Sequence, residues 1–96
     1  MMKEPCVYIM ANECRGTLYI GATSDLTQRV WQHKNKAMEG FSATYGLKRL
    51  VWFECHPTME EAILREKAMK KWRRTWKIDA IESMNPEWRD LYPELL

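Results

Sequence analysis

Two short runs near the start of the chain, CVYIM and LYIG, alternate aliphatic residues with a tyrosine, Tyr8 in the first and Tyr19 in the second. A period of two is typical of half-buried strands, and the connecting segment contains Asn12 and Gly16, which favour a turn. The pattern therefore predicts a β-hairpin. Successive side chains of a strand point to opposite faces, so burying the aliphatic residues together places Tyr8, Tyr19 and Gly21 on the other face.

The rest of the chain predicts one further strand and three helices. The apolar run at residues 50–55 is too short for a helix and is typical of a third strand. We expect helices at about 26–38, at about 59–73 and at 75–84, the last ended by the Asn85-Pro86 pair. Thr23, Ser24 and Asp25 are candidate N-caps for the first helix. Thr58 with Glu61 three residues later forms a capping box for the second.

Length and composition indicate a single globular domain over residues 1–96, with 46% hydrophobic and 29% charged residues. No apolar run approaches the ~20 residues that a membrane helix needs, and the N-terminus does not resemble a signal peptide, so we expect a cytoplasmic protein without membrane contact. The three cysteines contain no CxxC pair, which suits neither a disulfide framework nor a zinc ribbon, and reduced thiols are expected.

The overall charge of +2 is mild, but basic residues gather in one segment. Between positions 65 and 77 the sequence contains one acidic residue, Glu66, and seven basic residues: Arg65, Lys67, Lys70, Lys71, Arg73, Arg74 and Lys77. Such a run suits the phosphate backbone of a nucleic acid. Trp72 and Trp76 are interleaved with it and are expected in the core, although exposed tryptophans would stack on bases.

Glu66 is an unusual residue for its place on the second predicted helix. Its neighbours three and four positions away include Ala62, Ile63 and Met69, so it lies on an apolar face. Burying a carboxylate costs several kcal/mol unless a cation or a hydrogen-bond donor compensates it. A salt bridge to Lys70 would do so, and a role as metal ligand or catalytic acid is the alternative.

The spacing of these residues resembles the GIY-YIG nuclease family. Ten residues separate Tyr8 from Tyr19, the Tyr19-Ile20-Gly21 motif follows, Arg29 lies eight positions after the glycine, and His33 lies four beyond that. The resemblance runs from Tyr8 to the NPEW segment at 85–88 and is greatest to small stand-alone members of the family.

This resemblance implies an α+β fold, with a three-stranded antiparallel sheet flanked by about three helices, and a site on the face that carries both tyrosines. It implies a metal-dependent endonuclease that hydrolyses nucleic-acid phosphodiester bonds with Mg²⁺ or Mn²⁺. Glu66 matches the metal-binding glutamate, Arg29 the phosphate-contacting arginine, and Tyr8 and Tyr19 the paired tyrosines. Gly21 matches the glycine at the strand end, and His33 an auxiliary histidine of some members.

Two features depart from the family pattern. The first motif reads Cys6-Val7-Tyr8 in place of Gly-Ile-Tyr, which removes a glycine and keeps the phenol. The family's middle-loop tyrosine or histidine and its late asparagine are matched only loosely, by Tyr45 and Asn85.

The expected partner is DNA, with RNA as an alternative and with branched or damaged structures in repair or recombination as candidate substrates. Arg29 and the basic residues Lys67, Lys70, Lys71, Arg73 and Arg74 are the expected nucleic-acid contacts. Because appended domains usually choose the target in this family, a protein partner is a further expectation. The alternatives are a nucleic-acid binding module of the same fold with weak or no turnover, and a protein-interaction domain. The two tyrosines could also be ordinary packing partners, and Arg29 with His33 a solvated helix face.

Overall fold

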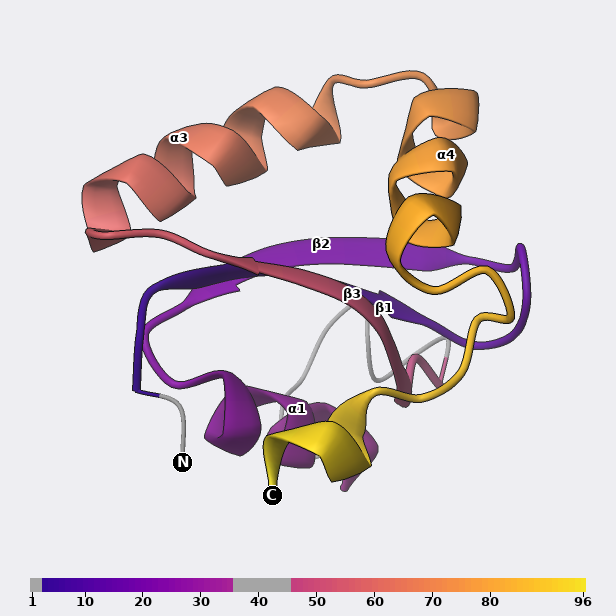
Figure 1. Cartoon of the computed structure of the whole chain (residues 1–96), viewed down its shortest axis with the longest axis horizontal. Coiled ribbons are helices and arrows are strands. Elements are labelled where there is room, and N and C mark those ends of the chain that lie inside the picture. Colours follow the sequence, from indigo (N-terminus) through magenta and orange to yellow (C-terminus); the bar gives the residue numbers. More distant parts are fainter. Residues whose placement is uncertain (1–2, 36–45) are drawn as a thin grey trace.

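The fold is a three-stranded antiparallel sheet with helices on both faces, shown by a computed structural model that describes residues 3–35 and 46–96 (Figure 1). Its elements are β1 (Cys6–Ala11), β2 (Leu18–Thr23), α1 (Leu26–Lys34), β3 (Arg49–Cys55), α3 (Met59–Lys70), α4 (Arg74–Met84) and the short 3₁₀ helix η1 (Tyr92–Leu95). The strand order is β2-β1-β3, so β1 is central. The expected α+β fold is confirmed.

The register of the hairpin fixes which side chains share a face. Tyr8 pairs with Gly21, and Met10 pairs with Tyr19, along the antiparallel β1–β2 ladder. Directly paired residues point to the same side of a sheet, and residues two apart on a strand do as well. Tyr8, Tyr19 and Gly21 therefore lie on one face, as the alternation predicts.

Each face of the sheet is covered by different helices. On one face, α3 and α4 pack over aliphatic residues of all three strands, and the fully buried Trp88 completes that half of the core. On the other face, Leu26 and Val30 of α1 pack with Tyr8, Met10 and residues of the C-terminal segment. Figure 1 shows α3 and α4 above the sheet and α1 with η1 below it.

The helix starts follow local capping chemistry. The Asp25 side chain accepts a hydrogen bond from the backbone N–H of Gln28 at 3.1 Å and begins α1, so the third of the three candidate caps is the one used. Thr58 accepts from the backbone N–H of Glu61 at 3.2 Å and begins α3, which confirms the expected cap, while the Glu61 carboxylate accepts from the Thr58 hydroxyl and not from its backbone N–H. Within the described residues α1 ends at Lys34; the expected continuation over 36–38 lies outside them.

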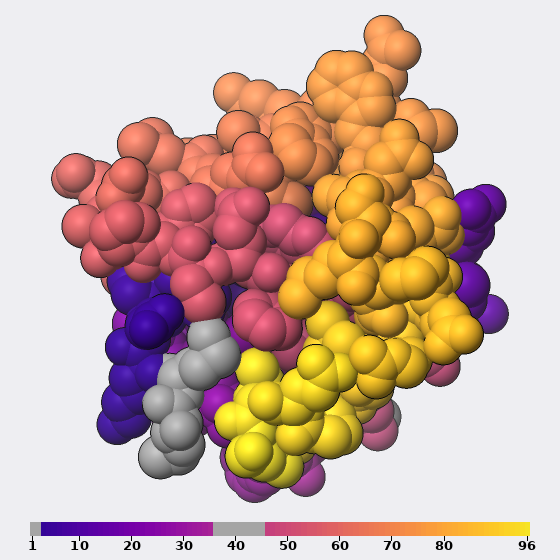
Figure 2. All heavy atoms as spheres, viewed as in Figure 1, coloured from indigo at the N-terminus to yellow at the C-terminus, as the bar shows by residue number. Residues whose placement is uncertain are grey.

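The second helix is shorter than expected, because α3 ends at Lys70 and Arg73 has an extended backbone before α4 begins. After α4, Asn85 donates to the Val51 carbonyl at 3.2 Å and fixes the exit of the chain on β3. The C-terminal segment then crosses the molecule, with Leu91 and Leu95 buried and η1 against α1. Figure 2 shows this segment, in yellow, closing the lower part of the visible face.

Candidate active site

Three aromatic rings from three different elements meet on the α1 face of the sheet. Tyr8 comes from β1, Tyr19 from β2 and His33 from α1. The ring centroids lie 6.3 Å apart for the two tyrosines, 5.5 Å for Tyr8 and His33, and 5.3 Å for Tyr19 and His33. The Tyr8 hydroxyl lies 2.9 Å from His33 Nε2, within hydrogen-bond distance. The strand pairing and the helix thus bring together three predicted site residues.

The absence of a side chain at Gly21 makes room for the Tyr8 ring. A Cβ atom on Gly21 would lie 2.6 Å from the Tyr8 hydroxyl oxygen and 2.7 Å from Cζ, far inside van der Waals contact. Tyr8 is fully buried, so its ring has no open space to move into. The glycine that ends the YIG motif is therefore required by the position of the first tyrosine.

Two charged residues act on the same phenol. Burial raises the pKa of Tyr8 above its ordinary value, and Tyr19 adds to this rise. The positive charge of Arg29, one helical turn before His33, opposes this rise in the pKa of Tyr8. The negative charge of Glu66 contributes a further, smaller rise in the pKa of Tyr8. Glu66 belongs to α3 on the opposite face of the sheet, so its influence reaches Tyr8 from the other layer.

His33 is neutral at physiological pH. Burial lowers its pKa from 6.5 to about 4, and the positive charge of Arg29 adds to the effect. A neutral imidazole accepts on one ring nitrogen, so the Tyr8 hydroxyl can donate its proton to Nε2. This arrangement requires the tautomer that carries its proton on Nδ1. The positive charge of Arg29 lowers the pKa of both members of this Tyr8–His33 pair.

Glu66 is both paired and partly buried. Its carboxylate lies 3.0 Å from Nζ of Lys70, four residues later on α3, and the Glu66 side chain is 17% exposed. Ala62 and Met69 beside it are buried, but Ile63 is 38% exposed, so the apolar face predicted around Glu66 is only partly covered. The expected salt bridge to Lys70 is therefore present, and half of the Lys70 side chain faces solvent.

The residues that could hold a metal ion are few. In the described ranges 3–35 and 46–96, no three His, Cys, Asp or Glu side chains are grouped as metal ligands. Mg²⁺ commonly uses one or two carboxylates, and water and substrate phosphate oxygens complete its coordination. Glu66 of α3, a single hard oxygen donor across the sheet from the aromatic cluster, fits this type of site and does not fit an all-protein cage.

The family comparison agrees with this geometry. The model of the GIY-YIG catalytic domain matches residues 4–79, which include both tyrosines, Arg29, His33 and Glu66. The chain belongs to the GIY-YIG nuclease family. The GIY-YIG match ends within α4, so the C-terminal segment that closes the α1 face lies beyond it.

Similar curated proteins are small GIY-YIG relatives that carry the name UPF0213. The chain is 33% identical over 72 residues to the UPF0213 protein of Bacillus pumilus, an alignment that covers 75% of this chain and 74% of that one. It is 38% identical over 73 residues to the relative from Haloquadratum walsbyi, covering 73% and 80%. No solved structure matches the chain. None of the helices in the described part of the chain has the length and apolar character needed to cross a bilayer.

Asn85, one of the two residues that match the GIY-YIG pattern only loosely, makes its hydrogen bonds away from the aromatic cluster. Asn85 is buried, and its amide donates to the carbonyls of Val51 and Arg89 while its oxygen accepts from the Arg89 N–H. These bonds tie the end of α4 to β3, which gives Asn85 a structural role. Tyr45 lies outside the described residues.

The basic segment forms an exposed surface at the junction of α3 and α4. Exposed side chains include all five of the expected basic contacts of this segment: Lys67, Lys70, Lys71, Arg73 and Arg74. The expectation that both tryptophans are core residues is wrong for Trp76, which is 52% exposed, whereas Trp72 packs against the core. Their four-residue spacing does not put them on one helix face, because Trp72 follows the end of α3 at Lys70 and Trp76 belongs to α4.

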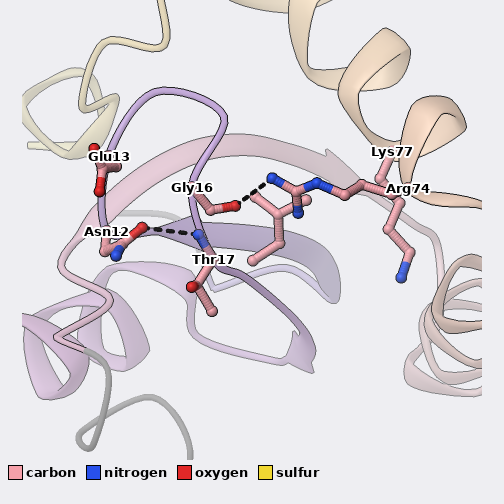
Figure 3. A pocket seen from close by; sticks show the side chains of 7 residues that line it. Asn12, Glu13, Gly16, Thr17, Arg74 and Lys77 are labelled. Atoms are coloured by element: carbon pink, nitrogen blue, oxygen red, sulfur yellow. Dashed lines mark hydrogen bonds between the residues drawn. The ribbon is translucent and has the colours of Figure 1, made fainter.

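Sequence reasoning missed a hollow at the β1–β2 turn. This cavity of about 510 Å³ lies between the turn and α4 and includes Thr17, Arg74 and Lys77 in its lining (Figure 3). Asn12 accepts from the Thr17 N–H at 2.8 Å, and Arg74 donates to the Gly16 carbonyl at 2.6 Å. Arg74 is therefore already engaged with the turn. Only the basic character of Arg74 and Lys77 could have indicated this place from sequence.

Proposed function

We propose that this protein is a metal-dependent endonuclease that hydrolyses phosphodiester bonds in DNA, with Glu66, Tyr8, Tyr19, Arg29 and His33 as its site. The observation that carries the proposal is the Tyr8 hydroxyl, held 2.9 Å from His33 Nε2 while Arg29 and Glu66 both act on it. Membership of the GIY-YIG family supports it independently. An ordinary packing tyrosine does not require this set of polar partners.

Tyr8 and His33 would together accept the proton of the attacking water. A phenol whose pKa is raised is a poor base by itself, because it stays protonated at neutral pH. The hydrogen bond between Tyr8 and His33 offers a route around this difficulty. As the water oxygen bonds to phosphorus, its proton passes to the Tyr8 oxygen, and the original Tyr8 proton passes to the neutral Nε2 of His33.

Arg29 and Glu66 would stabilise the charge on the phosphate. Arg29 presents a planar set of donors that match two phosphate oxygens, and its positive charge acts on the Tyr8 hydroxyl. Glu66 would hold Mg²⁺ or Mn²⁺, which supplies Lewis-acid stabilisation of the phosphate oxygens when bound. Tyr19 would orient the phosphate or the water from the side of the ring cluster.

The basic surface at the α3–α4 junction would bind the nucleic acid beside the site. Lys70 lies one helical turn from Glu66, so a strand whose phosphate reaches Glu66 passes over it. Further along, the guanidinium of Arg73 lies 5.8 Å from the centroid of the half-exposed Trp76 ring. Positive charge with an exposed aromatic ring suits unpaired or flapped DNA, in which bases are available for stacking. Branched and damaged structures offer such segments.

The decisive test is cleavage by matched variants of α3. Glu66→Gln removes the charge and keeps the shape, and Glu60→Gln makes the same change at an exposed position of the first turn. We expect wild type and Glu60→Gln to cleave flapped or nicked DNA with Mg²⁺ or Mn²⁺, and Glu66→Gln to lose cleavage by at least about 100-fold. Denaturation curves of the variants would show that both are folded.

Two results would overturn the proposal. Equal cleavage by Glu66→Gln and wild type would exclude Glu66 from the reaction. Salt-dependent DNA binding by folded wild type, with no product from any DNA or RNA structure under either metal, would identify a binding module instead. Loss of binding itself as salt rises is expected in both cases, since phosphate contacts release counterions.

A further inference from the structure

Cys6 and Cys55 face each other across neighbouring strands. Cys6 of β1 and Cys55 of β3 are direct partners in the antiparallel register, and their Sγ atoms lie 3.3 Å apart in a side-chain hydrogen bond. They are separated by 49 positions in the sequence, so only the sheet brings them together. Both are free thiols in this structure.

The hydrogen bonds of the two strands place this pair in the closer of the two antiparallel geometries. His56 donates its backbone N–H to the Pro5 carbonyl at 2.8 Å, which makes Pro5 and His56 a hydrogen-bonded pair. The adjacent Cys6–Cys55 pair is therefore the non-hydrogen-bonded kind, whose Cα atoms are typically about 4.5 Å apart with side chains close together. Disulfides accept Cα separations of about 4.4–6.8 Å, so the strands need little movement to be bridged.

One sulfur of the pair is accessible and the other is not. Cys55 is exposed and lines an open hollow of about 490 Å³ with Glu4, Pro5 and His56, whereas Cys6 is completely buried. Burial raises the pKa of Cys6 to about 12, and its hydrogen bond to Cys55 adds to the rise. A dissolved oxidant therefore reaches Cys55 first, and Cys6 is positioned to react only with the sulfur next to it.

We infer that Cys6 and Cys55 form a reversible cross-strand disulfide when the protein meets a small-molecule disulfide. The Cys55 thiolate attacks one sulfur of the oxidant, whose S–S bond breaks and releases one thiol. The Cys6 thiolate then attacks Cys55 Sγ, the mixed disulfide breaks, and the second thiol leaves. The two protein thiols lose two electrons and two protons, and the oxidant gains them as two thiols. The bridge ties the strand that carries Tyr8 to β3.

The test uses oxidised glutathione and the Cys14→Ser variant of the full chain. Cys14 is exposed, so this substitution removes the third thiol without touching the core. After oxidation without denaturant, we expect monomeric protein whose mass has fallen by about 2 Da. The number of titratable thiols should fall from two to zero, and a digest should contain a peptide in which Cys6 and Cys55 are linked. The urea midpoint should rise on oxidation, because the bridge closes a long loop, and should return after reduction.

A second variant separates the bridge from other thiol chemistry. Cys14→Ser with Cys55→Ser leaves only the buried Cys6, and we expect its thiol and its urea midpoint to be unchanged by the oxidant. The inference is overturned if the Cys14→Ser protein keeps two thiols, if it accumulates a stable glutathione adduct on Cys55, or if it forms linked dimers. None of these readouts depends on nuclease activity.

Discussion

The substitution Gly21→Ala tests whether the Tyr8 ring is held in a fixed position. The added Cβ would lie 2.7 Å from Tyr8 Cζ and 2.9 Å from Cε1, whereas carbon atoms pack at about 3.5–4.0 Å. The ring or the strand must therefore retreat by about 1 Å. A movement of that size lengthens the 2.9 Å contact between the Tyr8 hydroxyl and His33 Nε2 beyond a useful hydrogen bond.

The cost can be worked out from these contacts. Overpacking in a core typically costs about 1–3 kcal/mol, and loss of a buried hydrogen bond about 1 kcal/mol more. The lower chain entropy of the unfolded alanine variant returns about 0.4–1 kcal/mol. We expect Gly21→Ala to lower the free energy of unfolding by about 1.5–3 kcal/mol in urea. Cleavage should fall by about 100-fold, the usual effect of a 1 Å misplacement in an active site.

Gly16→Ala is the matched control. Its Cβ would meet Asn12 Oδ1 at only 2.1 Å and Glu13 Cγ at 2.6 Å, shorter distances than at Gly21. Both neighbours are exposed side chains, and moving Asn12 gives up only the exposed hydrogen bond from the Thr17 N–H, so we expect a loss of about 1 kcal/mol and unchanged cleavage. If Gly21→Ala stayed within about 0.5 kcal/mol of wild type and cleaved DNA normally, the claim of a rigid Tyr8 would be wrong.

Three further predictions concern other parts of the structure. Because His33 titrates near 6.5 when unfolded and its pKa is lowered to about 4 in the fold, its stabilising effect is complete above about pH 6.5 and is lost as the pH falls toward 4. Urea titrations of wild type should show that the free energy of unfolding falls by about 1–3 kcal/mol over that pH window. His33→Gln should remove this part of the pH dependence, and a variant with the same pH dependence as wild type would refute the prediction. Trp76→Ala should weaken binding of single-stranded oligonucleotides by about fivefold or more, whereas Trp31→Ala, at an equally exposed tryptophan of α1, should not, and equal effects would exclude base stacking at Trp76. Thr58→Ala removes the cap of α3 and should cost about 1 kcal/mol in thermal or urea unfolding, and a neutral result would mean that packing alone sets the start of the helix.

The parts of the fold that sequence predicts are those set by local geometry. The shared face of Tyr8, Tyr19 and Gly21 follows from the two-residue period of a strand, which does not depend on the rest of the protein. The caps at Asp25 and Thr58 likewise depend on a side chain and an N–H group only three residues apart. Local patterns of this kind place most of the candidate site.

Contacts between segments that are far apart in the sequence cannot be predicted from such local patterns. The β1–β3 register shifts between Ile9 and Met10, and the sequence near these residues does not indicate this shift. The pairing of Cys6 with Cys55 depends on this long-range register between β1 and β3. The odd number of cysteines in the sequence gives no reason to expect that two of them are paired. The four-residue spacing of Trp72 and Trp76 predicts that both are core residues, but Trp72 follows the end of α3 at Lys70 and Trp76 belongs to α4.

The ion pair of Glu66 with Lys70 is compatible with a catalytic role. A carboxylate that is 17% exposed needs compensation before any substrate arrives, and a lysine at i+4 supplies it from the same helix. Lys70 is half-exposed, so the pair is worth at most about 1 kcal/mol, and a phosphate with its cation can displace the ammonium at little cost. The displaced lysine stays within one turn of the site and remains available to the next phosphate. The same residue can thus balance Glu66 in the free protein and bind the strand in the complex.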